Sequence, residues 1–141
     1  DNRAALRRSG LTDALARNGI TNPPAVDVAL PARFVSGRQG LSDLLNAGEF
    51  DVIVCSSDTL AQGAIVEAQS RGLRVPHDLA VIGFGDLDFA GDTWPSITTV
   101  SVDRHAIGHR AATLLADRIE GIAPQDAVVD IGFHFVERES A

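Results

Sequence analysis

The chain has 141 residues, of which 45% are hydrophobic and 22% charged, and its formal net charge is −7. This length and composition predict a single globular domain and exclude an intrinsically disordered chain. All 12 basic residues are arginine, which excludes reactions that need a lysine in a phosphate-binding loop, as a Schiff base or as a general base.

The acidic balance and the N-terminal sequence bear on partners and location. A net charge of −7 disfavours nucleic-acid binding by this chain itself, which would need a basic surface to neutralise phosphates. No apolar run approaches the roughly 18 residues of a membrane span, and residues 1–17 lack the continuous apolar core of a signal peptide. Since the single thiol, Cys55, cannot form an internal disulfide, the sequence predicts a cytoplasmic protein without membrane contacts.

The first third of the chain predicts a helix, a strand and a second helix. Leucine and alanine recur at helical spacing over residues 3–18, and Gly19 provides a helix stop. Residues 26–30 (VDVAL) are rich in β-branched side chains and bounded by turn residues, which predicts a strand. Ser36 then provides an N-cap for a helix that extends to about Ala47.

The same order of elements repeats in the middle of the chain. DVIVC at 51–55 predicts a strand, and residues 59–71 predict a helix. Either Ser57 or Asp58 can cap that helix, and the capping role alone is enough to account for Asp58. LAVIGF at 79–84 is a continuous apolar run of the kind found in strands that are buried on both faces.

The last third departs from this alternation. Residues 96–103 predict a strand or an extended crossing, and Asp103 can cap a helix over 104–120. AVVDIGFHFVE at 127–137 predicts a long strand at an edge or in a return crossing. The preceding strands and helices are typical of an α/β fold with a doubly wound parallel sheet and helices on both faces.

In such sheets, ligands bind at the carboxyl ends of the strands, where loops and helix N-termini converge. Two loops, 55–58 and 83–88, follow apolar strands and are expected to open on the same edge of the sheet. In the first loop, Ser57 is equally compatible with a cap and with a ligand contact. In the second, Gly83 and Gly85 are first expected to serve the geometry of the turn.

The acidic residues of the second loop raise two alternatives. Asp86 and Asp88 have the spacing of the nucleophile motif of haloacid-dehalogenase-type phosphatases, but that chemistry also uses a lysine, which the chain lacks. Together with Asp92 they resemble part of a calcium loop, yet the position of the required glutamate is occupied by Ile97. Neither an enzyme nor a calcium site is therefore favoured.

Two further residue types could carry chemistry. His105 and His109 lie four residues apart and could share a helix face as metal ligands, but no third ligand is evident, so a solvated helix face is favoured. Cys55 lies at the end of a buried strand, where a small core residue is favoured over a nucleophile. The sequence predicts neither a metal nor a cofactor.

Five segments in order along the chain form a set: RxxGL at 7–11, VCSSDxxAxG at 54–63, RGLRVPxDLAVIGFxD at 71–86, PxITTV at 95–100 and VERES at 136–140. On these segments the chain resembles the LacI/GalR family of bacterial transcription regulators, and the third segment is the most specific. The stretches GFGDLDF and VVDIGFHFVERES are most similar to family members that repress gluconate utilisation.

The resemblance implies a type I periplasmic-binding-protein-like effector domain, in which two lobes joined by three crossings trap a small molecule. Residues 1–141 then correspond to the C-terminal part of that domain. Residues 1–101 and 122–141 would form the second lobe, and the helix at 103–121 would pack on the first. The first lobe and the helix-turn-helix headpiece of the family are expected to be absent from this chain, so operator DNA would be contacted only through that headpiece.

The resemblance also implies which residues contact the effector. Arg7 matches a family arginine that can direct two N–H donors at a carboxylate or at vicinal hydroxyls, although its local sequence alone favours a solvated helix charge. Ser57 matches a polar contact, and Asp58 lies beside it. Phe34 is a candidate for an aromatic residue that stacks on the ligand, and a role in the core or in a lid stays equally open.

The second loop departs from the family at Gly85, where members commonly have an aspartate that binds ligand hydroxyls or a base nitrogen. Asp86 matches the family but is not its usual principal contact. Because a buried pair of like charges is unfavourable, the missing carboxylate suits an anionic effector such as gluconate, with Arg7 as the counter-charge. The predicted effector is a small sugar or sugar acid.

Members of this family form homodimers, and the resemblance places the helix at 59–71, with Leu60, and the segment 88–94 at the interface. Phe89 and Trp94 are candidate apolar anchors, with ordinary core packing as the alternative. The predicted function is the ligand-sensing and dimerisation domain of a repressor, without enzymatic activity. Two other functions stay open: a solute-binding protein that feeds a transporter, and a small α/β hydrolase or phosphatase.

Overall fold

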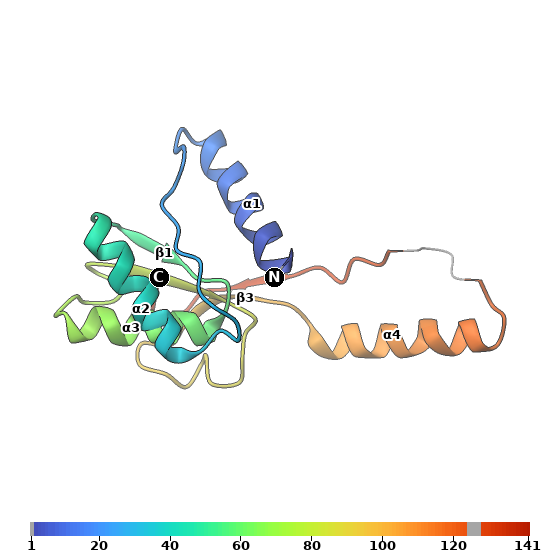
Figure 1. Ribbon diagram of the computed structural model, residues 1–141. Coiled ribbons are helices and arrows are strands. Elements are labelled where there is room, and N and C mark those ends of the chain that lie inside the picture. Colours follow the sequence, from blue (N-terminus) through green and yellow to red (C-terminus); the bar gives the residue numbers. More distant parts are fainter. Residues whose placement is uncertain (1, 124–127) are drawn as a thin grey trace.

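The computed structural model describes residues 2–123 and 128–141. The helices are α1 (Asn2–Arg17), α2 (Phe34–Ala47), α3 (Asp58–Ser70) and α4 (Arg104–Ile119). The strands are β1 (Val52–Val54), β2 (Ala80–Phe84), β3 (Thr98–Ser101) and β4 (His134–Val136). Figure 1 shows a sheet with helices packed against it, and α4 projecting away from it.

The sheet has the strand order β1-β2-β3-β4. Strands β1, β2 and β3 run parallel, and β4 adds an antiparallel edge next to β3. This arrangement confirms the predicted α/β fold with a mainly parallel sheet. The register pairs Val54 with Ile82 and Phe84 with Val100, so the three parallel strands end at one edge of the sheet.

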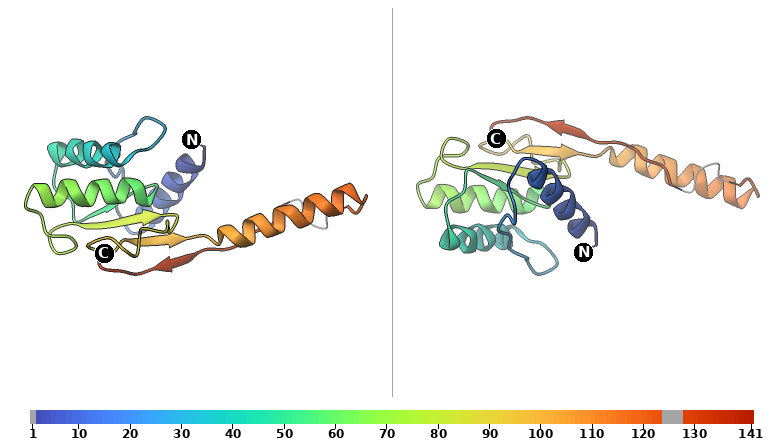
Figure 2. Two further views of the ribbon diagram at one scale, coloured as in Figure 1. Left: turned by 90° about the horizontal axis from the view of Figure 1, so that it is seen from below. Right: turned by 90° about the horizontal axis from the view of Figure 1, so that it is seen from above.

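The core lies between the sheet and the pair of helices α2 and α3, which Figure 2 shows as layers on one side of the strands. Along β2, Val81 is fully buried and Gly83 lies against α3. Phe84, one position on, faces the opposite side of the sheet, where it meets α1. The core cluster consists of Leu41, Ile53, Ala61, Ala64, Ile65, Ala68, Leu79, Val81, Ala90 and Ile97.

Helices α2 and α3 cross at very short range because each presents a glycine to the other. A Cβ at Gly37 would overlap the backbone of Leu60, and a Cβ at Gly63 would overlap the carbonyl of Phe34. The two backbones therefore touch directly, which fixes the first turns of α2 relative to α3.

Helix α4 has a different environment. Its predicted cap is confirmed, since the Asp103 carboxylate accepts the N–H of Ala106 at 2.8 Å. None of its residues is buried in this chain, and Ile107, Leu115 and Ile119 are 45%, 61% and 79% exposed. Along its described length α4 thus has an apolar stripe that the rest of the chain leaves uncovered.

Three predicted elements differ from the structure. Residues 26–30 form no strand, because within the described chain none of the strands pairs with them and they run as a largely exposed connection. Ser36 is not the cap of α2, which begins at Phe34; its hydroxyl instead accepts the N–H of Arg33 at 3.4 Å. The long strand predicted at 127–137 is reduced to β4, which pairs with only three residues of β3. Residue 127 lies outside the described residues.

The remaining predicted helices and strands are confirmed to within a few residues at their ends. Across the described ranges, none of the helices is long and apolar enough to cross a membrane.

Candidate functional site

The candidate site lies at the carboxyl edge of the sheet, where the loops after β1 and β2 meet. Because β1 and β2 are parallel neighbours, both loops open on this edge, as predicted. Arg7 of α1 joins them. Its Nη1 donates to the Ser56 carbonyl at 3.1 Å, and its guanidinium carbon lies 3.7 Å from the centre of the Phe84 ring. Three segments that are distant in sequence therefore converge at Arg7.

Arg7 is a half-buried cation with a restrained orientation. Burial lowers the pKa of its guanidinium, and repulsion from Arg3 lowers that pKa further. A guanidinium nevertheless stays protonated at neutral pH because its ordinary pKa is so high. Stacking on Phe84 restrains the planar group. The edge thus presents a cation of the shape that binds carboxylates and paired hydroxyls.

Ser57 is the N-cap of α3. Its Oγ accepts the N–H of Leu60 at 3.3 Å, so of the two roles left open by the sequence the structure displays the cap. Capping uses only a lone pair of the hydroxyl oxygen, and the O–H can still donate to a ligand. The cap therefore orients a potential donor at the site.

Asp58 is the first residue of α3, not its cap, and it is fully buried. Its Oδ1 accepts the hydroxyl of Thr99 at 2.6 Å, and its Oδ2 accepts the N–H of Leu87 at 2.7 Å. A Cβ at Gly83 would overlap this carboxylate, so the glycine is required by a close approach. Asp58 thus ties α3 to β3 and to the loop after β2, and both of its oxygens are engaged within the chain.

The loop after β2 has an unusual backbone at Gly85 and Asp86, whose φ angles are +121° and +50°. The Gly85 N–H donates to the carbonyl of Val100 at 2.9 Å. A Cβ at Gly85 would find room, with its nearest neighbours 3.8 and 3.9 Å away, but L-residues rarely adopt this φ. The glycine therefore serves the backbone conformation and also leaves this position without a carboxylate.

The Asp86 side chain faces the C-terminal segment. Its Oδ1 lies 2.8 Å from Nη2 of Arg138. The Asp86 carbonyl accepts from Nη2 of Arg104 at 3.0 Å, and the same nitrogen lies 3.3 Å from Asp88. Apart from the VERES segment, no sequence pattern pointed to Arg138, because its partner lies 52 residues away. The same holds for Thr99, whose partner Asp58 lies 41 residues away.

A cavity of about 530 Å³ lies at this edge, beside the start of α4. This volume is within the range of small-molecule sites. The cavity is lined by Asp86, Ser101, Val102, Asp103, Arg104, His105 and His134. The chain therefore offers concave space next to the loop that carries Gly85, but Arg7, Phe34 and Ser57 do not line it.

The remaining predicted site residues lie in different environments. Phe34 begins α2 and is 41% exposed, whereas Leu60 is only 7% exposed and is covered by α2. Because Leu60 belongs to the packing between the helices, it leaves little surface for a partner. Phe89 and Trp94 are 37% and 79% exposed, so Trp94 in particular is not a core residue of this chain.

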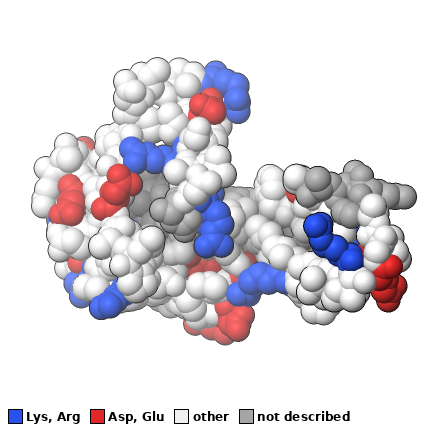
Figure 3. Space-filling model, turned by 45° about the vertical axis from the view of Figure 1, so that its right-hand side comes forward, with Lys and Arg blue, Asp and Glu red and all other residues white. Residues whose placement is uncertain are grey.

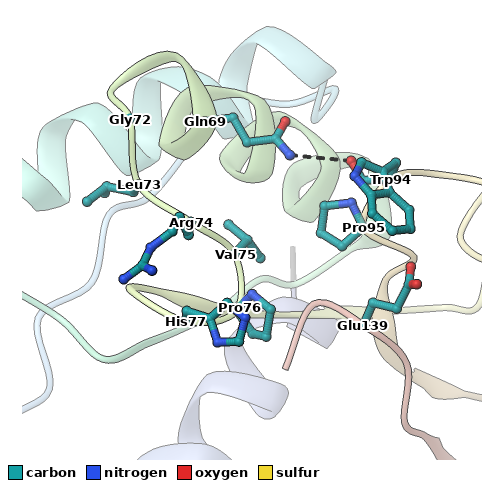
Figure 4. Close-up of a pocket in the computed structure, with 10 residues that line it drawn as sticks. All are labelled: Gln69, Gly72, Leu73, Arg74, Val75, Pro76, His77, Trp94, Pro95 and Glu139. Atoms are coloured by element: carbon teal, nitrogen blue, oxygen red, sulfur yellow. Dashed lines mark hydrogen bonds between the residues drawn. The ribbon is translucent and has the colours of Figure 1, made fainter.

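Trp94 lines a second cavity, of about 500 Å³, at the opposite edge of the sheet. In Figure 4, Trp94 and Pro95 lie on one side of it and the turn at 72–77 on the other. Nε2 of Gln69 donates to the Trp94 carbonyl at 3.4 Å. This contact ties the tryptophan segment to the end of α3.

The metal and nucleophile alternatives gain no support from the geometry. The rings of His105 and His109 stack with centres 6.4 Å apart, and the described residues include no cluster of three or more metal-ligating side chains. Burial, followed by the negative charge of Asp58, raises the pKa of the Cys55 thiol to about 12. At neutral pH this thiol is protonated and a poor nucleophile.

Charged side chains are interspersed on the face shown in Figure 3. Arginine groups alternate there with carboxylates and with uncharged surface. This distribution differs from the continuous basic face that binds phosphate backbones.

Residues 1–141 match the family model of the periplasmic binding protein-like domain, and the chain belongs to this family. The HTH-type transcriptional regulator GntR of Pseudomonas aeruginosa is 35% identical over 143 residues, which cover 99% of this chain and 41% of the relative. The chain thus spans less than half the length of this curated relative.

Solved structures give the same result. A regulator of the LacI family from Sanguibacter keddieii matches with a TM-score of 0.86 and 36% identity over 96% of this chain and 52% of that one. The transcriptional regulator CelR in complex with cellobiose matches with a TM-score of 0.87 and 29% identity over 96% of this chain and 42% of that one. The resemblance to LacI-type regulators is therefore confirmed, and all three of these relatives are transcriptional regulators.

Proposed function

We propose that this chain is the ligand-sensing and dimerisation part of a LacI-type transcriptional regulator that binds a small sugar or sugar acid. The observation that carries the proposal is the position of Arg7, which is stacked on Phe84 at the carboxyl edge of the sheet. Ser57 and Gly85 lie on the loops that open on the same edge. A relative that was solved with cellobiose supports a sugar as the class of ligand.

The charges at this edge favour an anionic sugar such as gluconate. The two oxygens of Asp58 accept hydrogen bonds from within the chain, and Asp86 is paired with Arg138. Gly85 adds no carboxylate, so Arg7 is positioned to meet a ligand carboxylate with little repulsion from neighbouring acids. Phe34 remains a proposed stacking partner that closes on the ligand.

The domain organisation is part of the proposal. Residues 1–101 and 122–141 form one lobe, and α4 packs its exposed stripe of Ile107, Leu115 and Ile119 on another lobe outside this chain. The uncovered state of this stripe supports the assignment, because apolar surface of this kind normally has a partner. Ligand binding between the lobes would favour one of their arrangements, and the change in arrangement would alter the DNA affinity of a separate headpiece in the cytoplasm.

Calorimetric titration of the full-length gene product with gluconate and with glucose tests the ligand class. Gluconate is expected to bind more tightly, and preference for the neutral sugar would reject an anionic effector. Gly85→Asp is expected to weaken gluconate binding more than Gly85→Ala, because only the first variant adds a charge. Both variants strain the same backbone, so Gly85→Ala is the matched control for strain.

A further inference from the structure

The ion pair between Asp86 and Arg138 joins the loop after β2 to the C-terminal segment. Its atoms are 2.8 Å apart, and the two side chains are 26% and 22% exposed. A pair of this burial is less screened by solvent than an open surface pair. Both partners come from segments that are separated by 52 residues, so the pair closes a long-range contact at the site.

Arg138 is itself held by hydrogen bonds to β3 and to the residue just before that strand. Its Nη1 donates to the Ile97 carbonyl at 2.9 Å, and its backbone N–H donates to the Thr98 hydroxyl at 2.9 Å. Ile97 and Thr98 are both fully buried. The guanidinium that faces Asp86 is therefore fixed to the rigid part of the fold.

The loop that receives this contact needs external support. Gly85 and Asp86 have positive φ angles, a conformation that persists where the surroundings impose it. Four contacts anchor the loop: the Val100 carbonyl accepts the N–H of Gly85, Asp58 accepts the N–H of Leu87, Arg138 pairs with the Asp86 carboxylate, and Arg104 donates to the Asp86 carbonyl. Of these anchors, only Arg138 acts on the Asp86 side chain.

We propose that Arg138 is a positioning residue for effector binding. It holds the Asp86 carboxylate, and through it the backbone at Gly85, in the conformation that shapes the site. In this proposal Asp86, although it lines the cavity beside α4, acts through its pair with Arg138 and not as a ligand contact. This inference rests on the proposed function and adds a role for a residue outside the two loops of the site.

A double-mutant cycle on the full-length gene product tests the inference, with Asp86→Asn, Arg138→Gln and the double variant titrated with gluconate and glucose. Each single variant is expected to raise the Kd on the order of tenfold, the usual scale for losing a hydrogen bond to a charged group. The double variant is expected to bind no more weakly than either single variant, because both remove the same pair. Arg74→Gln is the matched control. It removes the ion pair between Arg74 and Asp78, whose atoms are 2.6 Å apart and which lies away from this loop.

Amide hydrogen exchange of the same variants reports on the loop without any ligand. Exchange at residues 85–87 is expected to accelerate on the order of tenfold in Asp86→Asn and Arg138→Gln, and to stay unchanged in Arg74→Gln. Thermal unfolding of each variant checks that it is folded, and Asp86→Asn, which keeps the size of the side chain, covers the case in which Arg138→Gln does not fold.

Two results would overturn the inference. Additive losses of affinity in the double variant would show that Asp86 contacts the ligand directly. Unchanged exchange at 85–87 in Asp86→Asn would show that the pair does not hold the loop, whether or not a ligand binds. If neither gluconate nor glucose binds the unmodified protein, the proposed sugar-type effector is rejected. Amide exchange at residues 85–87 then decides by itself whether the ion pair holds the loop.

Discussion

Among the single residues, Asp58 organises the carboxyl edge of the sheet through contacts within the chain. A buried carboxylate is stable only if its oxygens accept hydrogen bonds, and the Thr99 hydroxyl and the Leu87 N–H supply them. These contacts place the loop after β2, while Ser57 takes over the cap. We therefore propose that the groups that meet a ligand are the Arg7 guanidinium, the Ser57 hydroxyl and the backbone at Gly85, with Phe34 as the stacking partner.

The carboxylate of Glu139 is expected to make the stability of the chain depend on pH. This carboxylate accepts the N–H and the hydroxyl of Ser96 at 2.9 and 2.8 Å, and these bonds hold its pKa below the usual value. A carboxyl whose pKa is lowered by folding stabilises the fold above its unfolded pKa of about 4.3, and this contribution is lost as the pH falls through the lowered value. The melting temperature of Glu139→Gln is expected to lie below that of the unmodified chain at pH 7, with the gap narrowing below pH 4.

Glu49→Gln is the control for this measurement, because Glu49 is exposed and its carboxylate makes no hydrogen bond or ion pair within the described part of the chain. Its melting temperature should follow that of the unmodified chain at both pH values. If the difference in melting temperature between Glu139→Gln and the unmodified chain were the same at pH 3 as at pH 7, the role of the ionised carboxylate would be contradicted.

At the scale of elements, the contact between α2 and α3 determines where Phe34 lies. Gly63 meets the Phe34 carbonyl and Gly37 meets the backbone of Leu60, so neither helix can shift without separating the pair. This crossing connects the proposed stacking residue at the start of α2 to the helix that Ser57 caps.

Gly63→Ala is expected to destabilise the chain by about 1–3 kcal/mol, the range for overpacking a close contact. The added Cβ would overlap the Phe34 carbonyl, which is backbone and cannot rotate away. Gly108→Ala in α4 is the matched control, because nothing lies within 4 Å of its Cβ position and alanine is the better helix former. Urea unfolding measures both variants, and equal stability of Gly63→Ala and the unmodified chain would refute the close crossing.

Local sequence was sufficient to predict elements whose signals are local. The cap at Asp103 predicts the helix that follows it, and the continuous apolar run before Gly85 predicts the strand β2. Residues 26–30 have the composition of a strand but no strand partner in the described chain, and composition does not reveal pairing. Likewise, the sequence shows an arginine at position 138 but does not predict its contact with Asp86, because that contact depends on the fold.

At the scale of the whole molecule, the two edges of the sheet have different surfaces. The carboxyl edge has Arg7 and the cavity beside α4, and the opposite edge has the cavity below Trp94. Trp94 is 79% exposed, and exposed tryptophans are frequent anchors of protein interfaces. This difference supports the proposal that the effector binds at the first edge and that the dimer forms at the second.

Trp94→Ala is expected to convert the full-length gene product from dimer to monomer without unfolding it, as measured by light scattering and circular dichroism. The reason is that an exposed anchor contributes to association and little to the core. Phe133→Ala is the control, because Phe133 is 71% exposed but lies outside the proposed interface. A Trp94→Ala protein that stays as dimeric as this control would place the interface elsewhere.

A calorimetric titration with gluconate tests whether Arg7 binds the effector, using three proteins: the unmodified full-length gene product, Arg7→Lys and Arg74→Lys. Arg74 lies at the opposite edge, where it pairs with Asp78. We predict one ligand per chain, an affinity at least about tenfold weaker in Arg7→Lys because lysine cannot supply the planar fork, and no change in Arg74→Lys. Unchanged affinity in Arg7→Lys would contradict the proposed site.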